Sequence, residues 1–546
     1  MGHGGCRSRP DGNRPRARDA GRAEAGGAHR RGRRSLRDQR GLRGAVPRGR
    51  EGAGESARED ECERRSDRAR ASSGGDRHAP HPHAPLRAPA PEEALGRGQR
   101  LHRRRPGHRR GRGSDAVNGP AKPTPSTHPS ERDLIYDWNV GESAPERPPR
   151  RVQVVDETLR DGLQSPSVAD PPIVEKIRAL HYQARIGVHG NDIGLPGAGP
   201  RAKEAALALA KEIAGQKLAI EPYCAARTLK ADIDPIIDIS QKAGLRIEAA
   251  TFIGSSPIRQ YAEDWDLDRM LRHTEEAVTY STKNGVPVMY VTEDTTRARP
   301  EILRKLYTTA IQCGARRVCV SDTVGHAIPE GAARVIRFMR EVVDGTGEKV
   351  GVDWHGHRDR DLGVANALAA LMAGADRVHG TILGIGERVG NAPLDLILIN
   401  LKLLGWLDSD LTALPEYCEL VSRACRVPLP YNYPALGRDA FRTATGVHAA
   451  AVIKARKKGD AWLADRVYSS VPADWLGLKQ RIDVGPMCGE SNVIFWLVEH
   501  GEEPDPKLVE HLFKLAKQRE TVFEDAELTK VVGEFKKAQA KAARVG

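Results

Sequence analysis

Two histidines separated by one glycine, His355-Gly356-His357, close an apolar run whose composition predicts a buried β-strand. Residues two apart on a strand point to the same side, so both imidazoles can reach one ion. Asp161 follows another such run, and Asn391 lies in a glycine-rich loop. Two imidazoles and one carboxylate with open positions suit a divalent ion that also accepts a substrate. These partners favour a catalytic metal site for Mg, Mn, Co or Zn, whereas an isolated histidine pair is more typical of a surface or a core.

A fixed positive charge precedes the aspartate of this predicted site. Arg160 can neutralise an enolate or alkoxide oxygen as charge develops on a metal-bound substrate. The alternative is a structural salt bridge from Arg160 to another acid such as Glu293. For Glu387-Arg388, inside the glycine-rich loop Gly384–Ala392, the sequence favours a structural ion pair.

These residues must be positioned by a regular framework, and from residue 150 to 410 apolar β-rich runs alternate with helical patterns. The expected strands are Val152–Leu159, Val188–Leu195, Leu218–Cys224, Leu245–Ile253, Val288–Thr292, Arg317–Ser321, Lys349–Trp354 and Arg377–Ile382. The expected helices between them include Pro172–Ala184, Arg201–Ala214, Asp266–Asn284, Pro300–Cys313, Pro329–Val343 and Gly363–Ala373. Eight such units predict an α/β fold, a (β/α)8 TIM barrel that forms the catalytic domain over residues 150–410.

Catalytic groups in a barrel of this kind come from the C-terminal ends of its strands. Polar residues of this chain that end or follow the expected strands are Arg160 and Asp161, Asp192, Glu293, Thr323, His355 and His357, and the loop Gly384–Asn391. We therefore expect them to meet at one rim. Residues 411–546 follow without further strand–helix alternation and predict mainly helical C-terminal subdomains.

The first 130 residues differ in composition from the rest and predict a disordered Arg/Gly-rich extension. Residues 1–115 contain 30 arginines, no lysine and 15 acidic residues, so they account for the chain's net charge of +13 and leave the remainder close to neutral. One interpretation is an arm that binds RNA or acidic partners, and the acidic residues argue against a transit peptide. The favoured interpretation is an over-extended start, because lysine first appears at Lys122 and the second methionine is Met270.

The remaining composition argues for a cytoplasmic protein. We expect no membrane span and no secretory leader, because no apolar run approaches the ~18 residues that a span needs. The 8 cysteines show no C-x-x-C spacing and are expected to be reduced. Nucleic acid is not an expected partner of the near-neutral folded part.

Residues 152–492 resemble the acyl-CoA-dependent 2-oxoacid synthases of the DRE-TIM metallolyase superfamily, which include the 2-isopropylmalate, homocitrate and citramalate synthases. Leu159–Gln164 matches the L-R-D-G-x-Q motif of that family, and His355-Gly356-His357 matches its H-x-H. Gly384–Ala392 matches the G-I-G-E-R-x-G-N-A segment of isopropylmalate and citramalate synthases, where the related hydroxymethylglutaryl-CoA lyase has a cysteine-bearing loop.

The resemblance implies a Claisen-type condensation of acetyl-CoA with a 2-oxoacid that releases CoA, in the manner of a 2-isopropylmalate synthase of leucine biosynthesis. It implies a homodimer in which His448 acts in trans on the partner's barrel. The implied metal ligands are Asp161, His355 and His357, with Asn391 close by; the implied substrate-binding residues are Gln164, Thr323 and Asp192; the implied catalytic residues are Arg160, Glu293, His448 and, as a weaker candidate, Tyr468.

Several positions depart from the pattern of that family. Arg358 and Asp361 replace an asparagine and a glycine after the H-x-H motif, Thr443-Ala444-Thr445 replaces H-E-S, and Met487-Cys488-Gly489 replaces H-S-G. Asp192 replaces a glutamate. These changes leave the predicted metal site intact and leave the identity of the 2-oxoacid open. No leucine-sensing domain is expected before Gly546.

Three alternatives remain. The first is a homocitrate or citramalate synthase, and the second is a cleavage enzyme similar to hydroxymethylglutaryl-CoA lyase. The third is a scaffold or nucleic-acid-binding protein that uses the arginine-rich arm.

Overall fold

The computed structural model describes residues 131–139 and 147–545. The extension expected over residues 1–130 lies outside the described residues, so its predicted disorder stays a prediction. A short helix, α1 (Glu131–Leu134), begins the described part.

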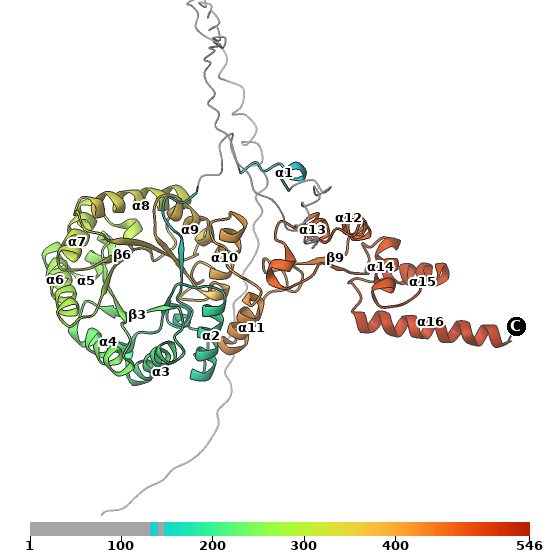
Figure 1. The fold of residues 1–546 in the computed structure, drawn as a ribbon, viewed down its shortest axis with the longest axis horizontal. Coiled ribbons are helices and arrows are strands. Elements are labelled where there is room, and N and C mark those ends of the chain that lie inside the picture. The colour runs from blue at the N-terminus through green and yellow to red at the C-terminus, as the bar shows by residue number, and fades with distance from the viewer. Residues whose placement is uncertain (1–130, 140–146, 546) are drawn as a thin grey trace, which may run out of the picture. The chain divides into compact units, whose positions relative to one another are not determined.

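Eight parallel strands form a closed barrel in which each strand pairs with the next in chain order (Figure 1). The strands are β1 (Gln153–Asp156), β2 (Gly190–Asp192), β3 (Glu221–Arg227), β4 (Glu248–Gly254), β5 (Val288–Glu293), β6 (Arg317–Asp322), β7 (Gly351–Gly356) and β8 (Arg377–Gly380). β1 closes the barrel by pairing with β8, with Val154 opposite Val378. The predicted TIM barrel is therefore confirmed.

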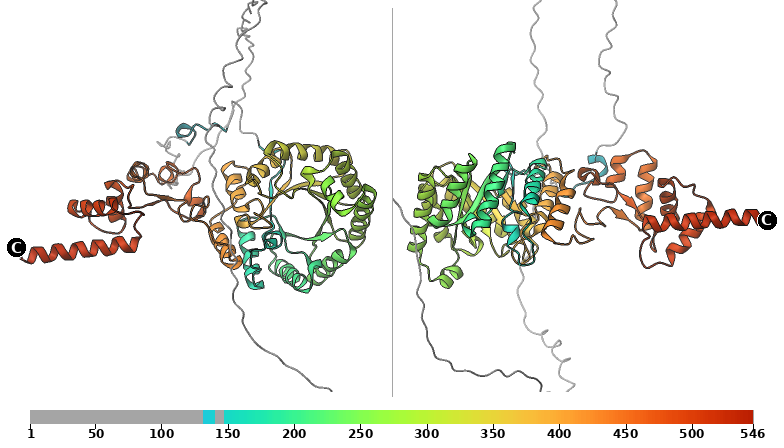
Figure 2. Two further views of the ribbon diagram at one scale, coloured as in Figure 1. Left: turned by 180° about the vertical axis from the view of Figure 1, so that it is seen from behind. Right: turned by 90° about the horizontal axis from the view of Figure 1, so that it is seen from below.

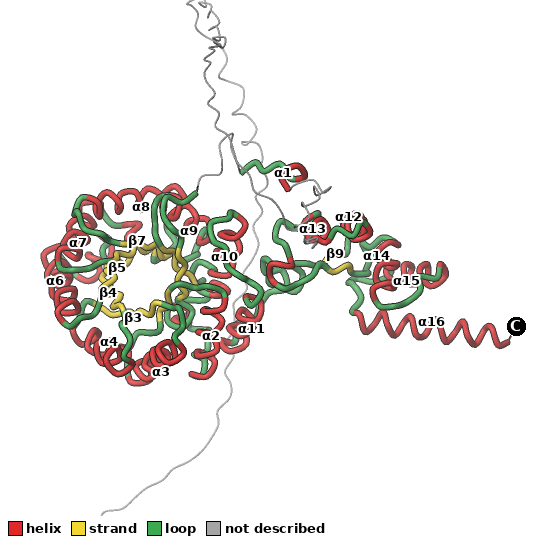
Figure 3. Tube along the Cα trace, viewed as in Figure 1, coloured by secondary structure: helices red, strands yellow, loops and turns green. Residues whose placement is uncertain are grey.

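Helices form the outer ring around these strands (Figures 2 and 3). They are α2 (Ile173–Arg185), α3 (Pro200–Gln216), α4 (Lys230–Ala243), α5 (Pro257–Glu263), α6 (Leu267–Lys283), α7 (Pro300–Gln312), α8 (Pro329–Asp344), α9 (Gly363–Met372) and α10 (Leu394–Leu403). α8 illustrates why they form, because it begins with Pro329 and buries Ala332, Ile336, Met339 and Val343 along one face. The strands are buried on both faces, as in β6, where Val318, Cys319 and Val320 are all inaccessible.

The C-terminal ends of β1 and β7 differ from the prediction, and both lie at the rim where the predicted site residues meet. β1 ends at Asp156, three residues before Leu159, because the Asp156 side chain accepts a hydrogen bond from the backbone N–H of Thr158 at 2.7 Å and the chain turns there. β7 continues beyond Trp354 because Ser321 and Asp322 of β6 still pair with His355 and Gly356. His355 thus lies within a strand, and His357 lies just after it.

The C-terminal region is mainly helical, as predicted. Its helices are α11 (Leu414–Cys425), α12 (Gly446–Lys457), α13 (Ala461–Arg466), α14 (Glu490–Glu499), α15 (Pro506–Lys517) and α16 (Asp525–Val545). A two-residue parallel ladder between β9 (Arg442–Thr443) and β10 (Arg481–Ile482) interrupts them. The last three helices share a core of their own around Val493, Leu497 and Leu512. None of the described helices has both the length and the apolar character that crossing a membrane requires.

Candidate metal site at the barrel mouth

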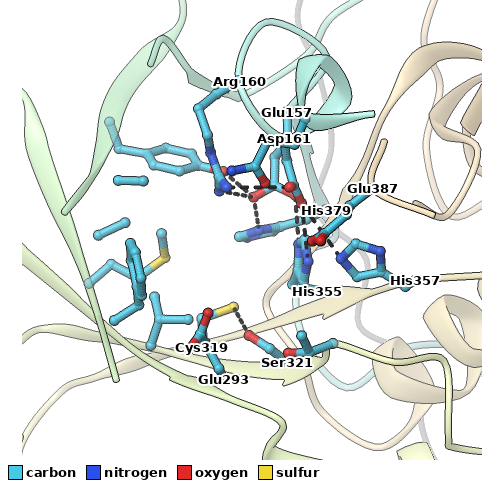
Figure 4. A pocket seen from close by; sticks show the side chains of 18 residues that line it. Glu157, Arg160, Asp161, Glu293, Cys319, Ser321, His355, His357, His379 and Glu387 are labelled. Carbon is cyan, nitrogen blue, oxygen red and sulfur yellow. Dashed lines mark hydrogen bonds and ion pairs between the residues drawn. The ribbon is translucent and has the colours of Figure 1, made fainter. Parts of the chain in front are cut away.

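A cavity of about 170 Å³ lies among the side chains that the barrel strands direct inward and at their C-terminal ends (Figure 4). Most residues predicted from the sequence line it, namely Arg160, Asp161, Gln164, Glu293, Thr323, His355 and His357. Asp192, Asn391, His448 and Tyr468 are not among the lining residues. Side chains at or just after the ends of β1, β5, β6 and β7 therefore meet at this cavity, as expected for the C-terminal rim of the barrel.

The predicted ligands Asp161, His355 and His357 face one another. His355 Nε2 lies 3.4 Å and His357 Nε2 lies 3.8 Å from Asp161 Oδ2. Bonds of about 2.0–2.1 Å in tetrahedral geometry place neighbouring donor atoms about 3.3–3.4 Å apart, so this spacing suits a bound metal ion. Burial and the neighbouring His355 lower the pKa of His357 to about 4, which keeps its imidazole in the neutral form that a ligand needs.

One orphaned oxygen near the three ligands, Asn391 Oδ1, supports a cation site. Among the described residues, Asn391 Oδ1 and His357 Nδ1 are buried without a hydrogen-bond partner. An antiparallel bridge joins the backbones of Asn391 and His357, so the two residues are neighbours. A buried carbonyl oxygen without a donor is costly, and a nearby cation or its bound water relieves that cost. The donor set and the carbonyl oxygen of Asn391 fit a divalent ion.

Glycines bring the segments of the site together. Gly390 has a φ of +103°, and a Cβ at this position would lie 1.8 Å from the carbonyl oxygen of Gly384. Only glycine permits this close approach, which places Asn391 beside His357. Gly162, next to Asp161, packs so closely on Ile385 that an added Cβ would meet its side chain at 3.0 Å.

Arg160 forms an ion pair with Asp192. The sequence had suggested a salt bridge from Arg160 to Glu293 as the alternative to a catalytic role. Arg160 Nε donates to Asp192 Oδ2 at 2.6 Å, and Nη1 lies 3.4 Å from Asp161 Oδ1. Asp192 is fully buried, and burial raises its pKa to about 6 although Arg160 opposes the shift. Asp192 therefore lies behind Arg160, away from the cavity, and Glu293 pairs instead with Arg259 at 3.4 Å.

Thr323 and Glu293 present functional groups to the cavity from β6 and β5. Thr323 Oγ1 accepts a hydrogen bond from the backbone N–H of Asp294 at 2.8 Å, so its own O–H can donate to a ligand. Burial raises the pKa of Glu293, with Arg259 and Arg160 opposing the shift. A carboxyl group of raised pKa at the edge of a cavity is suited to proton transfer. Gln164, Ser321 and Glu387 add further polar groups to the lining.

Two buried cavity residues, Glu157 and His379, were missed in the sequence. Glu157 Oε2 lies 2.6 Å from His355 Nδ1, and Glu157 Oε1 lies 2.9 Å from His379 Nδ1. Burial alone would raise the pKa of Glu157, but the two histidines outweigh it and hold this pKa well below its usual range. Glu157 in turn raises the pKa of His379 to about 9 against the effect of burial. One available signal was the alternation of Arg377 and His379 within an otherwise apolar strand.

His448 and Tyr468, predicted as catalytic residues, lie together in the C-terminal region. Their rings stack with centroids 4.3 Å apart. His448 is on α12 and exposed, and Tyr468 follows α13 with 46% of its surface exposed. The predicted action of His448 from a second copy of the chain stays a prediction.

Known proteins resemble this chain in sequence over most of the described residues. The profile of the HMGL-like family matches residues 151–421. The chain is 33% identical to homocitrate synthase AksA of Methanopyrus kandleri over 390 residues, which cover 70% of this chain and 92% of that protein. It is 34% identical to a probable 2-isopropylmalate synthase of the same organism, covering 68% of this chain and 70% of the relative. A 2-isopropylmalate synthase of Sulfolobus acidocaldarius is 33% identical, with coverage of 64% and 86%.

Proposed function

Since the chain belongs to the HMGL-like family, together with 2-isopropylmalate and homocitrate synthases, we propose that it is a divalent-metal-dependent transferase that condenses acetyl-CoA with a 2-oxoacid. The observation that carries the proposal is the group Asp161, His355 and His357, whose donor atoms face one another at the barrel mouth. Relatives of this chain named as synthases support the direction of the reaction, which is condensation rather than cleavage.

Each polar residue of the cavity has a separate role in this proposed reaction. A cation held by Asp161, His355 and His357, of the class of Mg, Mn, Co or Zn, supplies Lewis-acid polarisation of the keto oxygen of the 2-oxoacid. Arg160 stabilises the negative charge that develops on this oxygen as the new carbon–carbon bond forms. Thr323 donates its free O–H to the carboxylate of the substrate, and Gln164 orients the acetyl group.

Glu293 is the proposed general base for the acetyl methyl group of acetyl-CoA. Its carboxylate removes a proton from the acetyl methyl group, so that the methyl carbon attacks the keto carbon; the proton held by Glu293 then passes to the alkoxide oxygen that this attack forms. Water then hydrolyses the thioester and releases CoA. His448 and Tyr468 belong to the proposal as groups supplied by a second copy of the chain, because neither lines the cavity of the described chain. The enzyme is accordingly a homodimer in this proposal.

The apolar wall of the cavity favours a 2-oxoacid with a neutral side chain. Ala225, Ala250, Phe252, Met289 and Val291 form this wall on β3, β4 and β5. Among the described lining residues Arg160 is the one arginine or lysine, and Asp192 already pairs with it. A second carboxylate on the substrate would therefore be buried without a cation, which is costly. This argues for an isopropylmalate-type substrate over the longer dicarboxylic 2-oxoacid of a homocitrate synthase.

The state of the cysteines supports a cytoplasmic location for this enzyme. The described cysteines are all free, which is typical of a reducing compartment. We therefore place the enzyme in the cytoplasm, in amino-acid biosynthesis.

The test is thiol release from acetyl-CoA with a panel of 2-oxoacids, each assayed with and without a chelator. We expect release with branched or small neutral 2-oxoacids, little with dicarboxylic ones, and loss of activity in chelator that added metal restores. Equal activity in chelator would contradict the metal site, and a preference for dicarboxylic 2-oxoacids would contradict the substrate assignment.

A further inference from the structure

A line of buried charged side chains runs through the barrel interior next to the predicted ligands, and Figure 4 shows its first two members, Glu157 and His379. We call Glu157, His379, Asp353 and Arg377 the interior charge chain; each is at most 2% exposed. TIM-barrel interiors are normally filled by branched apolar side chains. Burying charges is costly even when they are paired, so this arrangement calls for a reason beyond packing.

Glu157 joins this chain to a predicted metal ligand. The carboxylate accepts, so the 2.6 Å contact to Glu157 Oε2 makes His355 Nδ1 the hydrogen-bond donor. A neutral imidazole that carries its proton on Nδ1 leaves a lone pair on Nε2. That nitrogen is the one 3.4 Å from Asp161 Oδ2. We propose that Glu157 is a positioning residue that fixes the tautomer and ring orientation of His355 for metal binding, and that His379 holds Glu157 in place.

His379 is built to hold the carboxylate of Glu157. Its Nδ1 lies 2.9 Å from Glu157 Oε1, and its Nε2 lies 3.0 Å from Asp353 Oδ2. Asp353 is anchored in turn by Arg377 Nε at 2.7 Å and Arg317 Nη1 at 2.9 Å. Tyr223 donates a further hydrogen bond to Glu157 Oε1 at 2.7 Å. Each oxygen of Glu157 is therefore occupied, and its carboxylate cannot rotate away from His355.

A second metal ion between Glu157, His355 and His379 is the competing interpretation, since their donor atoms also lie within 4.8 Å of one another. The contacts of 2.6 and 2.9 Å are hydrogen-bond distances. Both contacts are shorter than the separation of about 3.3 Å between two donors on a tetrahedral ion, and the 2.6 Å contact is also shorter than the separation of about 2.8–3.0 Å between adjacent donors on an octahedral ion. The geometry therefore assigns these three residues to hydrogen bonding and a single ion to Asp161, His355 and His357.

The experiment compares Mn²⁺ binding by the full chain and its variants, by calorimetry and by the electron paramagnetic resonance signal of free Mn²⁺. The Glu157→Gln variant keeps the shape of the side chain. Its single carbonyl oxygen can accept a hydrogen bond from only one of the two histidines at a time. Loss of such an outer partner weakens metal binding by about 10–100-fold, and we expect this loss for Glu157→Gln. His379→Gln should lose less, because Glu157 still contacts His355. The double variant should bind no more weakly than Glu157→Gln alone, because His379 acts through Glu157.

Asp156→Asn is the matched control. Asp156, the last residue of β1, directly precedes Glu157 and is also buried, but its carboxylate accepts hydrogen bonds from Thr158 and Tyr417 and does not contact the ligands. This variant should retain wild-type affinity for Mn²⁺, and thermal unfolding of the metal-free proteins measures any general loss of stability separately. If Glu157→Gln does not fold, His379→Gln carries the comparison.

The inference rests on the proposed metal site, and the outcomes distinguish the two. A wild-type chain that binds no divalent ion contradicts the site and the inference together. Wild-type binding with unchanged affinity in the folded Glu157→Gln and His379→Gln variants overturns only the positioning role. Binding of two ions per chain overturns the assignment to hydrogen bonding.

Discussion

Replacing Arg160 with glutamine separates the proposed chemistry of this residue from its part in folding. Arg160 Nη1 lies 3.4 Å from the Asp161 carboxylate, so the guanidinium would lie beside a substrate bound at the group Asp161, His355 and His357. Loss of one such donor to a developing oxyanion lowers kcat by about 10²–10³-fold, or about 2.7–4 kcal/mol. Because the interaction strengthens as charge develops, we expect kcat to fall while the KM for the 2-oxoacid changes little.

The same change leaves Asp192 buried without its cation. Breaking a buried ion pair from one side costs about 3–5 kcal/mol; the Arg160 side chain is 19% exposed, so the lower end applies. The double variant Arg160→Gln/Asp192→Asn removes the orphaned carboxylate and should recover most of the Tm without recovering kcat. Thermal unfolding and the thiol-release assay measure the two quantities. Recovery of kcat in the double variant would refute the catalytic role of Arg160.

Three further expectations concern pH, the glycine loop and the cavity wall. The environment of His379 raises its pKa from an ordinary value of 6.5 to about 9 in the folded protein. The free energy of unfolding should therefore fall by about 3 kcal/mol as pH rises from 6.5 to 9. In the His379→Gln variant, denaturant titrations should show a smaller fall over the same pH range. Gly390→Ala should abolish Mn²⁺ binding, whereas Gly405→Ala, with positive φ but open space, should not. Ala250→Val should shift relative kcat/KM by about 10–200-fold from branched 2-oxoacids toward pyruvate.

Each expectation has an outcome that contradicts it. A wild-type stability that is flat between pH 6.5 and 9 would show that His379 is not held as an imidazolium. Retained Mn²⁺ binding in Gly390→Ala would show that the tight loop does not position the site. Unchanged substrate preference in Ala250→Val would place the substrate side chain away from β4.

Much of the fold and the proximity of the three candidate ligands could be predicted, because both depend on local patterns. Apolar runs and helical periodicities indicated the eight strands, and parallel strands in a barrel share one C-terminal rim. Asp161 and His357 could therefore be expected at the same rim although they are far apart in sequence. Boundaries such as the early end of β1 depend on a side-chain turn at Asp156, which periodicity does not report.

The interior charge chain could not be predicted because it depends on register between strands. His379 lies opposite Val155 in the pairing of β8 with β1, which places its ring next to Glu157. A polar residue within a strand indicates an unusual position but does not name its partner. The sequence suggested Glu293 as a salt-bridge partner of Arg160, whereas the structure shows Asp192. This partner could not be predicted either, because it depends on how the side chains are placed within the rim.

The most direct test of the central claim is a crystal structure of the full chain with Mn²⁺, in which anomalous scattering locates the ion. The account predicts one peak, about 2.0–2.2 Å from Asp161 Oδ2, His355 Nε2 and His357 Nε2, and its disappearance in Asp161→Ala. A peak between Glu157 and His379, or no peak at saturating Mn²⁺, would contradict the account.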